Sequence, residues 1–295
     1  IQRLETKSET EFKIMSFRHL KEVLTWIFEG TTSCSIGPRL KPDLSQVPHD
    51  SPEENFDDMV LSSLQKRLAI VCAAGMHSML IYGSPGSGKS MFLSRIPSIL
   101  PPMQDQHHIE ALRIHSLRGA RIPQSLLEGR PPFRHPHHQS SSAAVVGIPE
   151  APGEVALAHG GVLFLDEFPE FRRDVLEALR EPMETGTVAV SRAKRKAEWK
   201  SQVLLLGACN PCPCGWLGSD SNPCICPTSK ILAYQRKLSG PILDRINIHV
   251  NFFSRKPDSK KKYNLLENSL KQHPVTTKGL KKQVEATIAF GQSRN

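Results

Sequence analysis

Residues 79–90 read MLIYGSPGSGKS, a short apolar run followed by a loop rich in glycine and then by a lysine and a serine. The eight residues from Gly83 match the pattern G-x-x-x-x-G-K-[ST], in which backbone N–H groups approach phosphates at the N-terminus of a helix. The pattern predicts a strand over 79–82, a phosphate-binding loop and a helix; the alternative is a glycine-rich turn. The candidate nucleotide-binding residues are Gly83, Ser84, Pro85, Gly86, Ser87, Gly88, Lys89 and Ser90.

Two carboxylates follow a second apolar run, GVLFL at residues 161–165. Four consecutive apolar residues are typical of a central parallel strand buried on both faces, and open α/β sheets bind ligands at the carboxyl ends of their strands. Asp166 is therefore a candidate Mg²⁺ ligand together with Ser90, and Glu167 a candidate for polarising a water molecule against the γ-phosphate of ATP. Lys89 would contact the β- and γ-phosphates. Without the phosphate-binding loop, the two carboxylates would be ordinary surface residues.

Two further polar residues stand beside apolar strands. Asn210 follows VLLLGAC at residues 203–209, where it either caps the next turn or positions the attacking water of an ATPase. Arg245 precedes the alternating run INIHV at residues 246–250, so we expect it at the N-terminal end of a strand. In a strand parallel to that of the phosphate-binding loop, Arg245 would reach only a neighbouring subunit's nucleotide, as an arginine finger in trans, which predicts an oligomer. The alternative is a surface ion pair with Asp244.

Apolar runs and helical patterns alternate from about residue 55 to residue 253, which predicts an α/β fold with a parallel sheet between helices. Helices are expected over Ser16–Phe28 and from about Asn55 to Gly75, with a proline-rich linker over Thr31–Pro52 between them. The net charge is +9, of which residues 251–295 contribute +7. That basic stretch suits a polyanionic partner or is a solvated helix face.

The composition is that of a soluble globular protein, with 39% hydrophobic and 23% charged residues. No apolar run approaches the roughly 18 residues that span a bilayer. Ile1 opens no basic and apolar leader, so we expect a truncated N-terminus, no signal peptide, no membrane contact and a cytoplasmic location.

Five of the seven cysteines fall within residues 209–226, which in a long chain without a leader favours thiols and a metal over disulfides. Four of them form two C-x-C pairs, a tighter spacing than the usual C-x₂₋₄-C of tetrahedral zinc sites. We expect a structural Zn²⁺ whose loss loosens residues 210–227 without affecting the phosphate-binding loop; free thiols or a redox pair are the alternative. The candidate zinc ligands are Cys212, Cys214, Cys224 and Cys226.

The segment Thr187–Lys200 is predicted to form a β-hairpin, because Val188 and Val190 alternate with other residues on the way to a basic tip. A cluster of positive charge suits the phosphate backbone of a nucleic acid, although it is also typical of an exposed charged turn. The candidate DNA-binding residues are Arg192, Lys194, Arg195, Lys196 and Lys200.

The candidate site resembles that of an AAA+ ATPase, because its residues occur in the same order along the chain: Lys89, Asp166, Glu167, Asn210 and Arg245. The phrase RPPFRHPHH at residues 130–138 resembles the RPFRxPHH signature of the magnesium-chelatase-like AAA+ family called ComM or YifB. Shorter phrases fit the same family: PGE at 152–154, LAH at 157–159, EPME at 181–184, VSRA at 190–193, NPCPCG at 210–215 and SGP at 239–241. The resemblance covers about residues 43–295. The family's GGG loop is replaced here by VGIPEA at residues 146–151.

The resemblance implies a domain organisation. Residues 1–40 would be the remnant of an N-terminal S5-like, Lon-like domain, residues 41–54 a linker and residues 55–254 the ATPase core. Residues 255–295 would be a basic helical segment leading to a helical lid beyond this chain. The prolines in the histidine-rich segment 134–138 disfavour a compact metal site, so we expect a rigid structural or subunit-contact loop there.

The resemblance also implies a function, an ATP-driven ring motor, expected to be a hexamer, that moves DNA branches during recombination of incoming DNA. In related proteins a hairpin at the position of Thr187–Lys200 points into the central pore of the ring. Two alternatives remain: the ATPase subunit of a magnesium chelatase, and a catalytically inactive ATP-binding scaffold.

Overall fold

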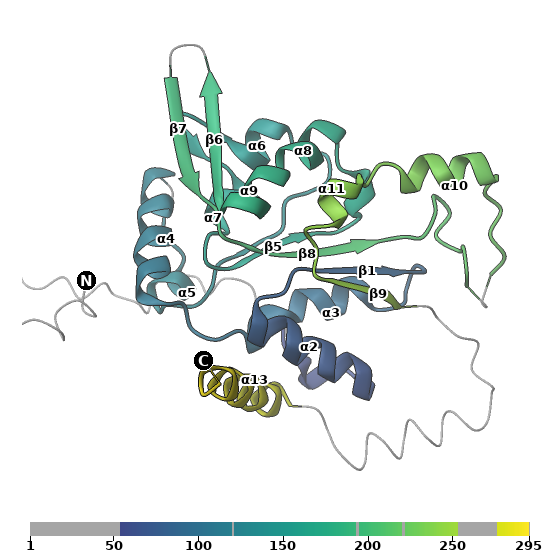
Figure 1. The fold of residues 1–295 in the computed structure, drawn as a ribbon, viewed down its shortest axis with the longest axis horizontal. Helices are drawn as coiled ribbons and strands as arrows, with labels where there is room; N and C mark the ends of the chain where they lie inside the picture. The colour runs from purple at the N-terminus through teal and green to yellow at the C-terminus, as the bar shows by residue number, and fades with distance from the viewer. Residues whose placement is uncertain (1–53, 120, 193–194, 220–221, 253–275, 295) are drawn as a thin grey trace, which may run out of the picture. The chain divides into compact units, whose positions relative to one another are not determined.

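The computed structural model describes residues 54–252 and 276–294, except residues 120, 193–194 and 220–221 (Figure 1). The chain divides into two compact units, Ile1–His49 and Asp50–Asn295, and every described residue belongs to the second. The expected helix over Ser16–Phe28, the linker and the N-terminal domain remnant therefore lie outside the described residues.

Strands and helices alternate along the second unit, as the sequence predicts. The strands are β1 (Met79–Gly83), β2 (Phe133–Arg134), β3 (Gly147–Ile148), β4 (Ala151–Pro152), β5 (Val162–Leu165), β6 (Thr187–Arg192), β7 (Arg195–Lys200), β8 (Leu204–Cys209) and β9 (Ile248–Phe252). The α-helices are α2 (Ser63–Gly75), α3 (Lys89–Arg95), α4 (Asp105–Leu117), α5 (Gln124–Leu127), α6 (Ser142–Val146), α7 (Glu154–Leu157), α8 (Arg173–Ala178), α9 (Arg180–Thr185), α10 (Thr228–Gln235), α11 (Gly240–Leu243) and α13 (Thr277–Gln292). Short 3₁₀ helices are η2 (Phe56–Asp58), η3 (Ile96–Ile99) and η4 (Phe168–Glu170).

Five of these strands form one parallel sheet in the order β2-β5-β8-β1-β9. Because the strands are parallel, their carboxyl ends lie at one edge of the sheet, and the loops after β1, β5 and β8 meet there. The predicted α/β fold with a parallel sheet between helices is confirmed.

The core has two layers, one on each face of the sheet (Figure 1). Strand β5 shows the division, because Val162 and Phe164 pack with α2, α3, η3 and α13, whereas Leu163 and Leu165 pack with α6, α7, α8 and α11. All four β5 residues are buried, as predicted for a central strand. None of the described helices is both long and apolar enough to cross a membrane.

Two boundaries differ from the sequence-based prediction. Helix α2 begins at Ser63 rather than near Asn55, because Ser62 caps it reciprocally with Gln65 and the preceding residues turn through η2. Strand β9 begins at Ile248 rather than at Ile246, whose N–H still donates to a carbonyl of α11 at 3.0 Å.

The C-terminal helix α13 lies against the core, beside α2 (Figure 1). Its Leu280 and Val284 are buried in the same cluster as α2. Thr277 joins its start to η2, donating through its N–H to Asp57 Oδ1 at 2.5 Å and accepting through Oγ1 from the N–H of Phe56 at 2.9 Å. The basic segment expected to be helical over residues 255–295 is helical over Thr277–Gln292, with one apolar face buried, and its residues 255–275 lie outside the described part of the chain.

Candidate nucleotide-binding site

The phosphate-binding loop lies between β1 and α3, the strand–loop–helix arrangement that the sequence predicts. Gly86 and Gly88 have φ values of 72° and 84°, a left-handed conformation that glycine adopts without strain. A Cβ atom at either position would meet nothing within 4 Å, so the space beside both residues is open.

Two serine hydroxyls of this loop are buried without a partner. The Oγ atoms of Ser84 and Ser87 have no hydrogen-bond partner among the described residues. Buried polar groups are normally paired, so these hydroxyls, next to open glycines at a helix N-terminus, fit a ligand rich in acceptor oxygens. The chemistry of the loop therefore fits a nucleoside triphosphate and its Mg²⁺ ion.

Lys89, the first residue of α3, is only 8% exposed. Its Nζ donates to the carbonyl oxygens of Gly83 at 2.8 Å and Ser84 at 2.9 Å, and to Oδ1 of Asn210 at 3.4 Å. Burial lowers the pKa of the Lys89 ammonium, and the nearby charge of Asp166 opposes that shift. The structure thus brings Lys89, Asn210 and the loop together, and Asp166 lies close enough to affect the ammonium.

Asp166 and Glu167 follow β5 at the carboxyl edge of the sheet. The register pairs Leu165 with Gly207 of β8, so the two carboxylates lie beside the strand that leads to Asn210. Glu167 has φ 52° and ψ 44°, an uncommon conformation for a residue with a side chain, and its N–H donates to Asp166 Oδ1 at 2.9 Å. Such strained backbone is characteristic of functional sites.

His138 is a site residue that sequence reasoning missed. Its Nδ1 lies 3.2 Å from Oε2 of Glu167, and the histidine side chain is 27% exposed. Residues 134–138 were expected to form a rigid structural or subunit-contact loop. The same segment brings the imidazole of His138 next to the carboxylate of Glu167, the candidate water-activating group. No spacing in the sequence indicates this contact, because it depends on the pairing of β2, in the same segment, with β5, whose end carries Glu167.

A cavity of about 370 Å³ opens beside Asn210 at the same edge of the sheet. Tyr82 of β1, Tyr234 of α10 and Asn251 of β9 contribute to its wall. The carboxyl edge is therefore hollowed on the side of α10, next to the phosphate-binding loop.

Arg245 lies away from this edge. Strand β9 runs parallel to β1 with Ile248 opposite Met79, so Arg245 precedes the N-terminal end of β9, as the sequence predicts. Its Nη2 donates to Glu184 of α9 and its Nη1 to the carbonyl of Pro241 at 2.6 Å, while Nε is buried without a partner among the described residues. The ion pair is thus with Glu184, not with Asp244.

The predicted hairpin over Thr187–Lys200 is confirmed as β6 and β7, and it projects beyond the helices on its face of the sheet (Figure 1). Val188 is buried in the core and anchors its base. Arg192, Arg195, Lys196 and Lys200 are exposed, and Arg195 pairs with Glu150 at 2.9 Å. Lys194 lies outside the described residues.

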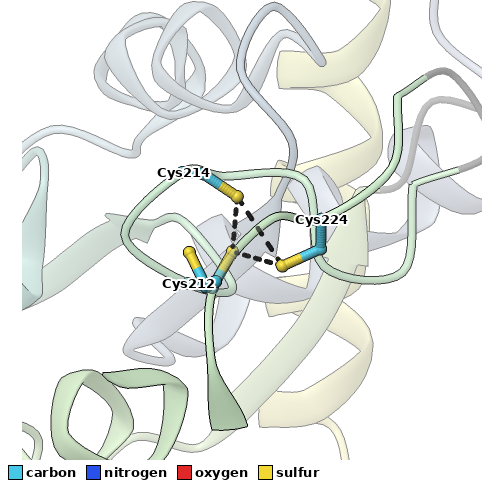
Figure 2. A group of neighbouring side chains, drawn as sticks. Cys212, Cys214 and Cys224 are labelled. Carbon is cyan, nitrogen blue, oxygen red and sulfur yellow. Dashed lines mark hydrogen bonds between the residues drawn. The ribbon is translucent and has the colours of Figure 1, made fainter. Parts of the chain in front are cut away.

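The four predicted zinc ligands come together in the loop between β8 and α10. Figure 2 shows three of them, Cys212, Cys214 and Cys224. Cys212 is buried and the other three are partly buried. All four are free thiols, so none of them is part of a disulfide.

The strand order, with the phosphate-binding loop after β1 and the two carboxylates after β5, is that of a P-loop protein of the AAA+ type. Residues 55–260, more than half of the chain, match the family model described as magnesium chelatase, subunit ChlI. The chain therefore belongs to the magnesium chelatase ChlI family.

Curated relatives agree with this assignment. The chain is 43% identical over 203 residues to the uncharacterized protein YifB of Salmonella typhimurium, covering 67% of this chain and 39% of YifB. It is 41% identical over 199 residues to the competence protein ComM of Haemophilus influenzae, covering 66% of this chain and 38% of ComM. A more distant similarity, 24% over 157 residues, covers 52% of this chain and 18% of the DNA replication licensing factor Mcm5 of Drosophila melanogaster. The matched region of the chain spans about two fifths of the length of its YifB and ComM relatives.

Proposed function

We propose that this chain is the ATPase core of a ring-forming motor that binds DNA and moves along it, as a ComM-like branch-migration helicase or translocase would. The observation that carries the proposal is the pairing of two features in one compact unit: a phosphate-binding loop with its carboxylates, and a projecting hairpin with an exposed basic surface. Hydrolysis at the first would supply the energy for movement of DNA held by the second.

The nucleotide site supports ATP hydrolysis through its own side chains. The loop residues from Gly83 to Gly88 would bind the phosphates with their N–H groups, and Lys89 would neutralise phosphate charge. Glu167 would accept a proton from the attacking water, which Asn210 would orient. Ser90 and Asp166 would hold Mg²⁺, which supplies charge neutralisation at the phosphates when bound.

The proposed ring follows from the position of Arg245. This guanidinium lies at the opposite end of the sheet from the loop of its own subunit, so it would contribute only to a nucleotide bound at a subunit interface. The ion pair with Glu184 would hold the Arg245 side chain in a fixed position at the surface of the subunit.

The choice of DNA as the moving partner rests on the hairpin. Four exposed basic side chains per subunit, repeated around a ring, would line the pore with charge that suits a phosphate backbone. The similarities to a competence protein and to a DNA replication licensing factor point in the same direction.

The hairpin makes a testable prediction about DNA affinity. Changing Arg192 and Lys196 together to alanine should weaken DNA binding on the order of tenfold at 0.1 M salt and reduce the salt dependence of the affinity. Fluorescence anisotropy with labelled DNA over a salt series measures both. The matched control removes the same charge from α13, through Lys281→Ala with Lys282→Ala, and should change the affinity much less.

Equal losses in the two double variants would contradict a role for the hairpin and assign DNA binding to the general basic charge of the chain. If the unmodified protein does not bind DNA, the DNA motor is excluded and the ATPase subunit of a magnesium chelatase is favoured. If the unmodified protein does not bind nucleotide either, both functions are excluded.

A further inference from the structure

A second site lies in the loop between β8 and α10, apart from the groups assigned to ATP. The sulfur atoms of Cys212, Cys214 and Cys224 lie 3.4, 3.7 and 3.6 Å from one another, as the dashed lines in Figure 2 show. The sulfur of Cys226 completes a group whose ligand atoms all lie within 4.8 Å of one another.

These spacings match one particular kind of metal site. Four thiolates bound tetrahedrally at Zn–S distances of about 2.3 Å place their sulfurs about 3.8 Å apart. Thiolates that bind the separate irons of a four-iron cluster would lie farther apart, because each would be attached to a different corner of the cluster. A disulfide would bring two sulfurs to about 2.05 Å. The geometry therefore fits four thiolates around a single ion.

The surrounding backbone is also suited to thiolates. Backbone N–H groups of Trp216 and Ile225 lie near the Cys214 sulfur, and that of Cys226 lies near the Cys224 sulfur. N–H groups close to sulfur on both arms of the loop favour negative charge there, as a thiolate ligand requires.

We propose that Cys212, Cys214, Cys224 and Cys226 bind one structural Zn²⁺ ion. This ion would stabilise the nucleotide site by fixing the position of Asn210. Cys212 stands two residues after Asn210, whose side chain accepts a hydrogen bond from Lys89. Fixing the cysteine fixes the direction in which the chain leaves β8, and with it the position of the asparagine.

A second contact links the loop to the phosphate-binding loop. A Cβ atom at Gly215 would lie 2.6 Å from Cδ and 2.7 Å from Cγ of Pro85. The backbone of the loop that carries the four cysteines therefore packs closely against the ring of Pro85. This contact favours a different outcome from the one expected from the sequence, in which metal loss leaves the phosphate-binding loop unaffected. We expect loss of the ion to loosen both loops.

Metal analysis of the full chain, purified anaerobically and without chelators, tests the site. We expect about one zinc and no iron per chain. Changing Cys214 and Cys226 together to serine should remove the zinc, whereas Cys72→Ala, which removes a buried thiol of α2, should retain it. Absence of zinc in the unmodified protein, iron in its place, or zinc retained by the double variant would overturn the proposal.

Two measurements on the unmodified chain avoid the risk that the double variant fails to fold. After removal of the metal with a chelator, titration with Co²⁺ should produce the absorption of a four-thiolate site and saturate near one ion per chain. Hydrogen exchange should become faster after metal removal in residues 84–88 as well as in residues 210–219. Unchanged exchange at 84–88 would contradict the link to the nucleotide site. No nucleotide is present in these experiments, so their outcome is independent of the proposed ATPase.

Discussion

Replacing Glu167 with glutamine should lower ATP hydrolysis by about 10²-fold or more while leaving ATP binding largely intact. The amide fills the same volume but cannot accept the proton of the attacking water, and none of the loop atoms that would bind phosphates is changed. Steady-state phosphate release and the binding of a fluorescent ATP analogue separate the two effects.

The matched control for this variant is Glu170→Gln, the same change three residues along at an exposed position paired with Lys237. It should leave hydrolysis unchanged. Lys89→Ala should behave differently from both, because loss of the ammonium removes a phosphate contact and weakens binding itself. Turnover retained by Glu167→Gln would exclude this carboxylate as the water-activating group.

The second large effect is expected at Arg245. Its change to alanine should leave ATP binding normal, because the arginine contacts Glu184 and Pro241 rather than its own phosphate-binding loop. Hydrolysis by a homogeneous ring should fall by about 10³-fold or more, the contribution of an arginine supplied in trans in related systems. The control is Arg172→Ala, which removes an exposed ion pair between Arg172 and Asp174 and should have little effect on hydrolysis.

Mixing experiments distinguish a trans arginine from a structural one. Subunits carrying Arg245→Ala retain an intact Glu167, and subunits carrying Glu167→Gln retain an intact Arg245. Mixed rings should therefore recover activity at interfaces where an intact carboxylate meets an intact arginine. Mixed rings that stay as inactive as either parent, with mixing demonstrated, would assign Arg245 to the ion pair with Glu184 alone.

Local sequence patterns predicted the elements that carry the site. The strand before Gly83, the buried strand before Asp166 and the hairpin over Thr187–Lys200 are present as expected, because periodicity and glycine spacing are properties of neighbouring residues. The parallel sheet then follows from their alternation with helices. It brings Lys89 and Asn210 to the same edge, although they are 121 residues apart.

The contacts that the sequence did not predict join side chains distant along the chain. No spacing rule pairs His138 with Glu167 or places Gly215 on Pro85, because such contacts depend on how two loops pack at the sheet edge. The alternative that pairs Arg245 with Asp244 is wrong for a similar reason. Asp244 is adjacent in sequence, but the fold brings Glu184 of α9 to the guanidinium. The burial of Val284 against α2 likewise depends on a return of the chain to the core.

The most direct test of the central claim is the rate of ATP hydrolysis by the protein with Mg²⁺, measured without DNA and with saturating DNA. A motor that couples the phosphate-binding loop to the basic hairpin should hydrolyse ATP in a magnesium-dependent manner, and DNA should accelerate it. A rate that equals that of Lys89→Ala under both conditions would contradict the account. Hydrolysis that is robust but indifferent to DNA would retain the ATPase and exclude the DNA motor.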